Sequence, residues 1–305
     1  MARIAVIGGG PAGFMAAVSA AAQTRPSAPG GLERMGGISA AERAEVTVLD
    51  AGVPLAKLLL TGGGRCNLAN VSFEGRELAA QYPRGGKFLL SALARFGPQE
   101  TMDWFQSRGC KLVVEDEGRV FPRSGKAQEV RALLEDEAGR LGVQVRARAP
   151  VTGIARAETG FTLQTPRGTE CFDRIIIATG GDLKDQEGSG CRLARSLGHT
   201  ITPLAPSLSA LVTAEAWPGT LAGLTLRGAR LTAVFQEGRV ADEQGDMLFT
   251  HTGISGPLAF RISSRCAFLP FSSYAPVRLL LTALPDRNAA EIEACLLEAI
   301  ASRPR

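Results

Sequence analysis

The residues with the most evident chemistry stand near the start of the chain, where Gly8, Gly10 and Gly13 form the pattern G-x-G-x-x-G. In a dinucleotide-binding turn the first glycine permits a sharp bend, the second lets the backbone approach a pyrophosphate, and the third lets the helix pack close to the strand. Pro11 suits the first helical turn, where its missing N–H costs nothing, and the neighbouring N–H groups face the phosphates. The alternative is a turn whose glycines serve packing alone, because the chain holds 36 glycines.

The elements around this motif are those that a dinucleotide fold requires. Residues 4–7 are an uninterrupted apolar run, typical of a parallel strand buried on both faces, and residues 14–22 are predicted to form an Ala-rich helix. A second strand over residues 45–50 ends on Asp50. An acidic residue there accepts hydrogen bonds from the adenosine ribose and repels a 2′-phosphate, which favours FAD or NAD over NADP. A surface loop over residues 23–44 lengthens the interval before Asp50, for which a simple turn role is the alternative.

A second glycine-rich stretch, KLLLTGGGRCN, occupies residues 57–67. Its glycines make the backbone pliable, and the polar side chains on both sides supply donors, so the loop could wrap a pyrophosphate or the edge of a ring. The candidate cofactor contacts are Lys57, Gly62, Gly63, Gly64, Arg65, Cys66 and Asn67. Cys66 could also be a redox thiol, although a packed residue within the loop is the favoured interpretation.

Farther along, residues 174–181 (RIIIATGG) are predicted to be another buried strand that runs into Gly180 and Gly181, at the sheet edge where ligands bind. Residues 127–141 have the spacing of an amphipathic helix, and the spacing of Leu90, Leu93 and Phe105 predicts core-facing helices.

Beyond residue 190, recurrent prolines and short β-like runs predict a β-rich domain. The expected fold class is α/β, with a doubly wound Rossmann-like domain over residues 1–190 and a second domain over 191–305.

Composition bounds the possible functions. The chain has 305 residues, 45% of them hydrophobic and 21% charged, which is ordinary globular composition. Its net charge is +4, and its 34 Lys and Arg are scattered without a run of five, so no nucleic-acid partner is expected. Six cysteines without a C-x-x-C pair and only two histidines make a metal site improbable. Without a signal peptide or an apolar stretch of membrane-spanning length, we expect a cytoplasmic protein with no membrane partner.

Six stretches occur in the following order: IGGGPAG (7–13), KLLLTGGGRCN (57–67), GRVFP (118–122), IATGG (177–181), LGHT (197–200) and LFTHTGISGP (248–257). Together they resemble a family of bacterial FAD-dependent oxidoreductases with a two-dinucleotide-binding-domain fold. This NAD(P)/FAD-dependent family includes proteins described as the aminoacetone oxidase family, and its relatives include bile-acid 3-oxo-4-ene reductases. The strings GGGRCN and FTHTGISGP are the most specific.

The resemblance implies a noncovalently bound FAD and assigns contacts to it. The pyrophosphate would be held by Gly8, Gly10, Pro11, Ala12 and Gly13. Asp50 would meet the adenosine ribose, and the backbone of Val151 the adenine. Lys57 and the 62–67 loop would line the cofactor, and Gly180 and Gly181 would close the site. The β-rich domain would be an insert after the IATGG strand. The family's return of the chain to the FAD domain after that insert is not seen in these residues.

The expected function is therefore that of an FAD-dependent oxidoreductase, which transfers a hydride between FAD and a small organic substrate or NAD(P)H. Because the flavin carries the redox chemistry, few catalytic side chains are needed. His251 is the candidate proton donor or acceptor, since an imidazole titrates near neutrality, and a structural role in its turn is the alternative. The alternative functions are a nucleotide-binding module without turnover and a flavoprotein acting on tRNA. The oligomeric state is not predicted.

Overall fold

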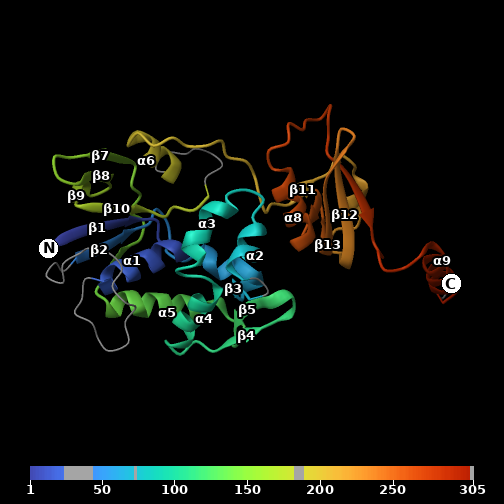
Figure 1. Ribbon diagram of the computed structural model, residues 1–305, viewed down its shortest axis with the longest axis horizontal. Coiled ribbons are helices and arrows are strands. Elements are labelled where there is room, and N and C mark those ends of the chain that lie inside the picture. Colours follow the sequence, from blue (N-terminus) through green and yellow to red (C-terminus); the bar gives the residue numbers. More distant parts are fainter. Residues whose placement is uncertain (24–43, 72–73, 182–188, 303–305) are drawn as a thin grey trace. The chain divides into compact units, whose positions relative to one another are not determined.

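Figure 1 shows the computed structural model of the chain, which describes residues 1–23, 44–71, 74–181 and 189–302. Apart from its end residues, the loop predicted over residues 23–44 lies outside these ranges. The chain divides into two compact units, Met1–Pro203 and Leu204–Arg305. Helix α6 (Gly190–Ser196) thus falls in the first unit rather than in the domain expected from residue 191, because Leu193 packs into an apolar core of that unit.

The first unit is built on a parallel sheet of four strands in the order β10-β1-β2-β6. The strands are β1 (Ala2–Ile7), β2 (Ala44–Leu49), β6 (Gln144–Arg146) and β10 (Arg174–Ile177). Helices α1 (Pro11–Gln23) and α5 (Ala127–Arg140) contact each other and share a core with one face of this sheet. The antiparallel strands β7 (Gly153–Arg156), β8 (Phe161–Thr165) and β9 (Gly168–Phe172) form a meander over the other face.

The side chains of the parallel strands alternate between two apolar cores. Val6 and Val48 lie in the core that contains α1 and α5, whereas Ile7 and Leu49 lie in the core under the meander. Both sets of side chains are buried, because a parallel strand covered on two faces needs apolar residues at every position. The prediction of a doubly wound α/β domain is confirmed.

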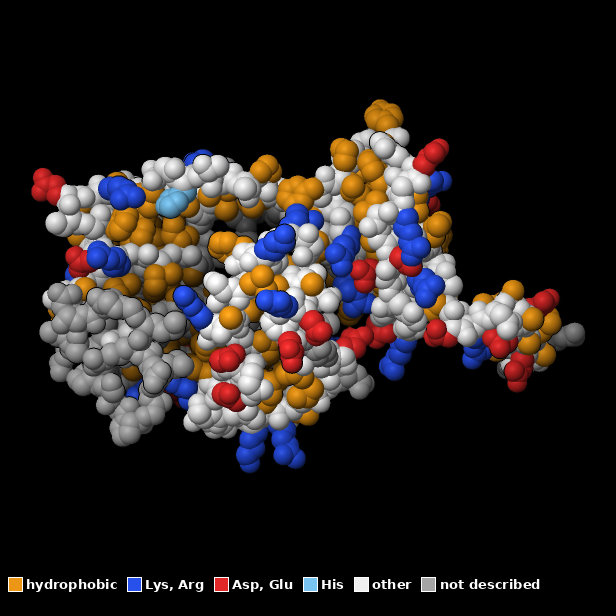
Figure 2. Space-filling model, in the orientation of Figure 1, with side chains coloured by type: hydrophobic (Ala, Val, Ile, Leu, Met, Phe, Trp, Pro, Cys, Tyr) orange, Lys and Arg blue, Asp and Glu red, His pale blue; other side chains and the backbone are white. Residues whose placement is uncertain are grey.

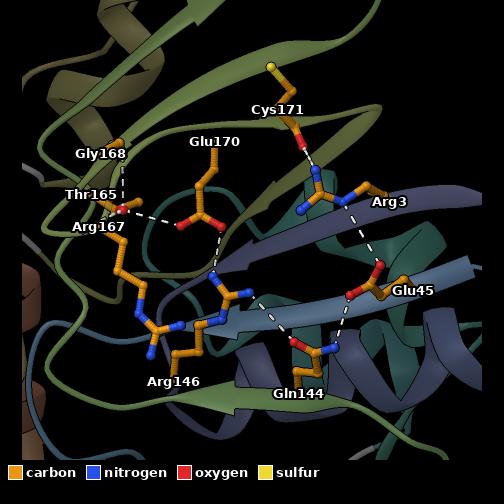
Figure 3. Close-up of polar contacts among 9 residues, drawn as sticks. All are labelled: Arg3, Glu45, Gln144, Arg146, Thr165, Arg167, Gly168, Glu170 and Cys171. Carbon is orange, nitrogen blue, oxygen red and sulfur yellow. Dashed lines mark hydrogen bonds and ion pairs between the residues drawn. The ribbon is translucent and has the colours of Figure 1, made fainter.

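A polar network ties the meander to the parallel sheet (Figure 3). Arg146 on β6 donates to Glu170 on β9 over 2.7 Å, and both side chains are mostly shielded from solvent. Arg3 on β1 donates to the Cys171 carbonyl over 2.6 Å. These contacts join strands that are remote in sequence, so they fix how the meander lies on the sheet.

A smaller antiparallel sheet follows the second glycine-rich stretch. Its strands are β3 (Ala69–Asn70), β5 (Arg119–Pro122) and β4 (Leu112–Val114), and two 3-10 helices, η1 (Lys57–Gly64) and η2 (Asp116–Gly118), adjoin them. Helices α2 (Gly75–Ala80), α3 (Gly86–Leu93) and α4 (Pro98–Gln106) lie between β3 and β4 in the chain. The prediction of a core face holds for Phe105, which is buried, and is wrong for Leu90 and Leu93, because α3 buries none of its residues.

The second unit is an antiparallel sheet in the order β11-β14-β13-β12-β15, as its β-rich texture predicted. The strands are β11 (Leu211–Val212), β12 (Thr225–Phe235), β13 (Gly238–Thr250), β14 (Gly253–Ser255) and β15 (Arg278–Thr282). Helix α8 (Pro257–Cys266) packs on β13 through Leu258 and Ile262, and α7 (Trp217–Thr220) and α9 (Ala289–Ala301) complete the unit.

On the face that Figure 2 shows, Lys and Arg side chains are interspersed with Asp and Glu side chains. Over the described ranges, no helix has the length and apolar character needed to cross a membrane.

Candidate dinucleotide site

The three glycines of the first turn occupy different steric environments. Gly8 has φ +107°, and a Cβ there would lie 2.4 Å from the Ala178 carbonyl oxygen. A Cβ on Gly13 would lie 1.9 Å from the Gly8 carbonyl oxygen, whereas one on Gly10 would meet nothing within 4 Å. Gly8 and Gly13 are thus required by the close packing of β1, α1 and β10. Gly10 borders open space, where a ligand can approach the backbone.

The start of α1 is suited to an anion. Pro11 is its first residue, and Phe14 N–H donates to the Gly10 carbonyl over 3.0 Å. The first turn holds no acidic residue, so no side-chain carboxylate there neutralises the positive end of the helix dipole. Pro11 and Ala12 are exposed, which leaves this end of the helix open to a phosphate group.

Asp50, the residue directly after β2, lies beside the same turn. Its Oδ2 accepts from Gly9 N–H over 2.6 Å, and its Oδ1 accepts from Gly52 N–H over 2.8 Å. The turn role considered for Asp50 is therefore present. Each carboxylate oxygen can accept more than one hydrogen bond, so the ribose role is still open to it. The role of Gly9, whose N–H positions this carboxylate, carried no signal in the sequence pattern.

The second glycine-rich stretch is anchored to the first, because Leu55 N–H donates to the Gly9 carbonyl over 2.8 Å. Lys57 is exposed at the start of η1. Gly62, Gly63 and Gly64 follow with φ values of +57°, +68° and +86°, a left-handed run that other residues rarely adopt. A Cβ on Gly63 would meet nothing within 4 Å, so the loop presents bare backbone to its surroundings.

Two of the polar side chains in this stretch turn toward the small sheet. Arg65 donates to both carboxylate oxygens of Glu115, over 2.8 and 3.0 Å, and its guanidinium lies 4.0 Å from the centre of the Phe121 ring. The side-chain amide nitrogen of Asn67 donates to the Val120 carbonyl oxygen over 3.2 Å. These contacts account for both residues without a cofactor.

Cys66 is buried within the core under η1. Burial raises the pKa of its thiol and outweighs the opposing hydrogen bond with Thr61. A thiol that stays protonated is a poor nucleophile, so its surroundings favour the packed role over the redox role.

The remaining predicted contacts of the first unit lie at the same end of the sheet. Ala149 N–H donates to the Asp50 carbonyl over 2.7 Å, which brings the segment before the buried Val151 against the Asp50 turn. Gly180 and Gly181 follow β10, and a Cβ on either would meet nothing within 4 Å.

The sequence patterns did not indicate the contact that holds α6 at this end. Thr179 Oγ1 accepts from Gly190 N–H over 3.0 Å, and a Cβ on Gly190 would lie 2.3 Å from that oxygen. A glycine at the start of α6 is thus required for the helix to reach the end of β10.

His251 belongs to the second unit, where it is exposed directly after β13. In the ranges that the structure covers, no cluster of His, Cys, Asp and Glu could hold a metal ion.

Comparison with known proteins identifies the family. The model of the HI0933-like protein Rossmann domain matches residues 27–256. The 3-dehydro-bile acid delta(4,6)-reductase of Clostridium scindens is 30% identical over 296 residues, which are 96% of this chain and 67% of that protein. The ribosomal RNA dihydrouridine synthase of Escherichia coli is 32% identical over 225 residues, 72% of this chain and 54% of that protein.

Among solved structures, the open conformation of a flavocytochrome c3 fumarate reductase aligns with 74% of this chain and 47% of its own. Its identity is 14% and the TM-score is 0.44. The family match covers most of the chain, and the resemblance to FAD-dependent oxidoreductases drawn from the motifs is confirmed. This chain belongs to the HI0933-like Rossmann-domain family.

Proposed function

We propose that this chain is an FAD-dependent oxidoreductase, which moves a hydride between FAD and a small organic substrate and takes reducing equivalents from NAD(P)H. The observation that carries the proposal is the open space at Gly10, flanked by the sterically required Gly8 and Gly13. That space lies at the start of α1. The Asp50 carboxylate lies beside the same turn, because it accepts a hydrogen bond from the N–H of Gly9. A dinucleotide pyrophosphate fits this combination of backbone donors, helix dipole and nearby ribose acceptor.

The residues present fit the cofactor in chemical type. The backbone N–H groups of Gly10, Ala12 and Gly13 would bind the pyrophosphate, Asp50 would accept from the ribose hydroxyls, and the exposed Lys57 would add a positive charge. The bare backbone at Gly63 and Gly180 would let a flat ring approach closely. When bound, FAD supplies a two-electron centre that accepts or donates a hydride.

The names of the two relatives suggest the type of substrate. A delta(4,6)-reductase of a 3-dehydro-bile acid reduces carbon–carbon double bonds conjugated to a ketone, and a dihydrouridine synthase saturates the uracil double bond that is conjugated to a carbonyl. We propose the same reaction class here. The substrate's β-carbon receives a hydride and its α-carbon receives a proton, for which His251 is the candidate donor.

The second candidate function is a nucleotide-binding module without turnover. The chain spans 54–67% of the lengths of these two curated relatives, so the activity of a whole relative does not transfer to it directly. A module of this kind would bind FAD through the first unit and show no reaction with NAD(P)H or an unsaturated carbonyl compound.

The absorbance spectrum of the purified chain, alone and after addition of FAD, tests both candidates. Bound flavin bands that bleach anaerobically with NADH or NADPH, and return on addition of cyclohexenone, are the expected result. The binding module would be established by bound bands that NADH and NADPH do not bleach, and that cyclohexenone does not restore after dithionite has reduced the flavin. A chain that takes up no FAD would refute the enzyme proposal.

A further inference from the structure

A polar cavity of about 310 Å³ lies in the first unit, on the outer face of the meander formed by β7, β8 and β9. Leu163 on β8 belongs to the core beneath the meander, so its neighbours Thr162 and Gln164 point away from that core. Helix α6 runs beside β7 (Figure 1), where Ser196 Oγ donates to the Ile154 carbonyl over 3.5 Å. The meander thus forms the floor of the cavity, and α6 forms its wall.

The polar side chains that line this cavity are rich in hydrogen-bond donors. They comprise four hydroxyls, one amide and one guanidinium: Thr152, Thr162, Thr169, Ser196, Gln164 and Arg192. None of the described residues that line the cavity is acidic. A guanidinium carries five N–H donors in a planar fork, so Arg192 can bind an anion in addition to its contacts with the protein. This set of donors favours a ligand that has a negative charge and further acceptor groups.

The polar groups of the floor are available to a ligand. A Cβ on Gly153 would clash with the side-chain oxygen of Gln164, so the bare backbone of β7 gives this amide its room. Among the described residues, neither this amide nor the hydroxyls of Thr162 and Thr169 has a hydrogen-bond partner in the protein. Amide and hydroxyl groups both donate and accept, so they can bind the hydroxyl groups of a ligand.

The size of the cavity limits the ligand. Liquid water occupies about 30 Å³ per molecule, so the cavity has the volume of about ten water molecules. A pentose or hexose with one phosphate group has a comparable volume, whereas a whole dinucleotide is several times larger. Arg192 is the one cation among the described residues that line the cavity, which suits one phosphate group rather than a chain of them. Leu193 also lines it, and the C–H face of a sugar ring can pack there.

We infer that the cavity between α6 and the meander is a binding site for a small sugar phosphate. Arg192 binds the phosphate group, and the hydroxyls and the amide of the floor bind the sugar hydroxyls. This inference does not rest on the proposed function, because none of these residues belongs to the glycine turns or to the second unit. It assigns to the first unit a second ligand site, separate from the dinucleotide turn.

Isothermal titration calorimetry of the flavin-free chain with ribose 5-phosphate tests this site. We expect saturable binding. Inorganic phosphate lacks the sugar and ribose lacks the charge, so each should bind at least about tenfold more weakly than ribose 5-phosphate. Gly10→Ala closes the approach to the glycine turn and should leave the affinity for ribose 5-phosphate unchanged, which separates the two sites.

Two arginines of α6 supply a matched pair of variants. Arg192→Met removes the guanidinium from the cavity and should weaken ribose 5-phosphate binding by at least about tenfold. Arg195→Met makes the same change on the same helix at a residue that does not line the cavity, so binding should be unchanged. Thr162→Val removes a hydroxyl from the floor with little change of volume and should weaken binding by about threefold to tenfold. Circular dichroism verifies that the variants fold.

Three results would overturn the inference: no saturable heat, equal affinity for ribose 5-phosphate and inorganic phosphate, or equal losses in the two arginine variants. A loss of binding in Gly10→Ala would also overturn it, because the ligand would then lie at the glycine turn. FAD uptake without ribose 5-phosphate binding would refute this site alone. Ribose 5-phosphate binding without FAD uptake would support this site and refute the enzyme proposal.

Discussion

A methyl group at Gly13 tests the steric account of the glycine turn. In Gly13→Ala the new Cβ would lie 1.9 Å from the Gly8 carbonyl oxygen, whereas a carbon–oxygen contact needs about 3.3 Å. The start of α1 must therefore move away from β1 by about 1 Å or more. Overpacking of this kind costs about 1–3 kcal/mol, and the better helix propensity of alanine returns about 1 kcal/mol. A net loss of about 1 kcal/mol remains, which corresponds to a Tm lower by about 2–4 °C for a unit of this size.

Gly10→Ala is the matched variant, because its Cβ would meet nothing within 4 Å. We expect its stability to be unchanged or raised by about 0.4–1 kcal/mol, since alanine restricts the unfolded chain. Its Kd for FAD should nevertheless rise at least about tenfold, a loss of about 1.4 kcal/mol, because the methyl group fills the approach to the pyrophosphate. Thermal unfolding by circular dichroism and titration of FAD fluorescence measure the two effects. Wild-type stability of Gly13→Ala would refute the steric argument, and wild-type FAD affinity of Gly10→Ala would refute the assignment of the pyrophosphate.

Three further predictions concern side chains of the first unit. Asp50→Ala should weaken FAD binding and lower Tm, because the charged hydrogen bond that Asp50 accepts from Gly9 N–H is worth about 1.5–3 kcal/mol. A Kd for FAD that calorimetric titration finds unchanged in the variant would contradict this. The hydrogen bond from Arg146 holds the pKa of Glu170 below its usual value, so this stabilisation is present above the unfolded carboxyl pKa and is lost as pH falls through the folded pKa. Urea unfolding of Glu170→Gln should accordingly show less loss of stability in acid than the parent chain. Cys66→Ala should leave the rate of flavin reduction by NAD(P)H unchanged, and a large loss would instead show a redox role for the thiol.

The sequence predicted those parts of the fold that depend on local patterns. The apolar run of β1 and the amphipathic spacing of α5 predicted both elements, since burial selects side chains with the period of the element. The strand–glycine–helix order also located the turn at Gly8 before any contact was known. The steric demands of this turn come from residues close in the chain or from the end of the paired strand, so a short sequence motif is enough to predict them.

Contacts between distant residues could not be predicted in the same way. Arg65 pairs with Glu115, 50 residues away, and no spacing rule identifies such a partner. Helix α8 was not predicted, although its side chains complete the core of the second unit. Leu90 has helical spacing, yet α3 remains exposed, because periodicity shows that a helix has an apolar face without showing what covers that face.

The hydrogen bond between Asp50 and Gly9 couples two functions that sequence patterns treat separately. Patterns assign the glycines to the pyrophosphate and the acidic residue to the ribose. Here the carboxylate accepts from Gly9 N–H over 2.6 Å, and Gly9 in turn accepts from Leu55 N–H over 2.8 Å through its carbonyl. Asp50 therefore holds the glycine turn in place, and Gly9 links that turn to the stretch that begins at Lys57. Such preorganisation lowers the ordering cost of binding, so loss of the Asp50 carboxylate should weaken the binding of AMP and of inorganic pyrophosphate alike. A loss confined to AMP would show that the carboxylate serves the ribose alone.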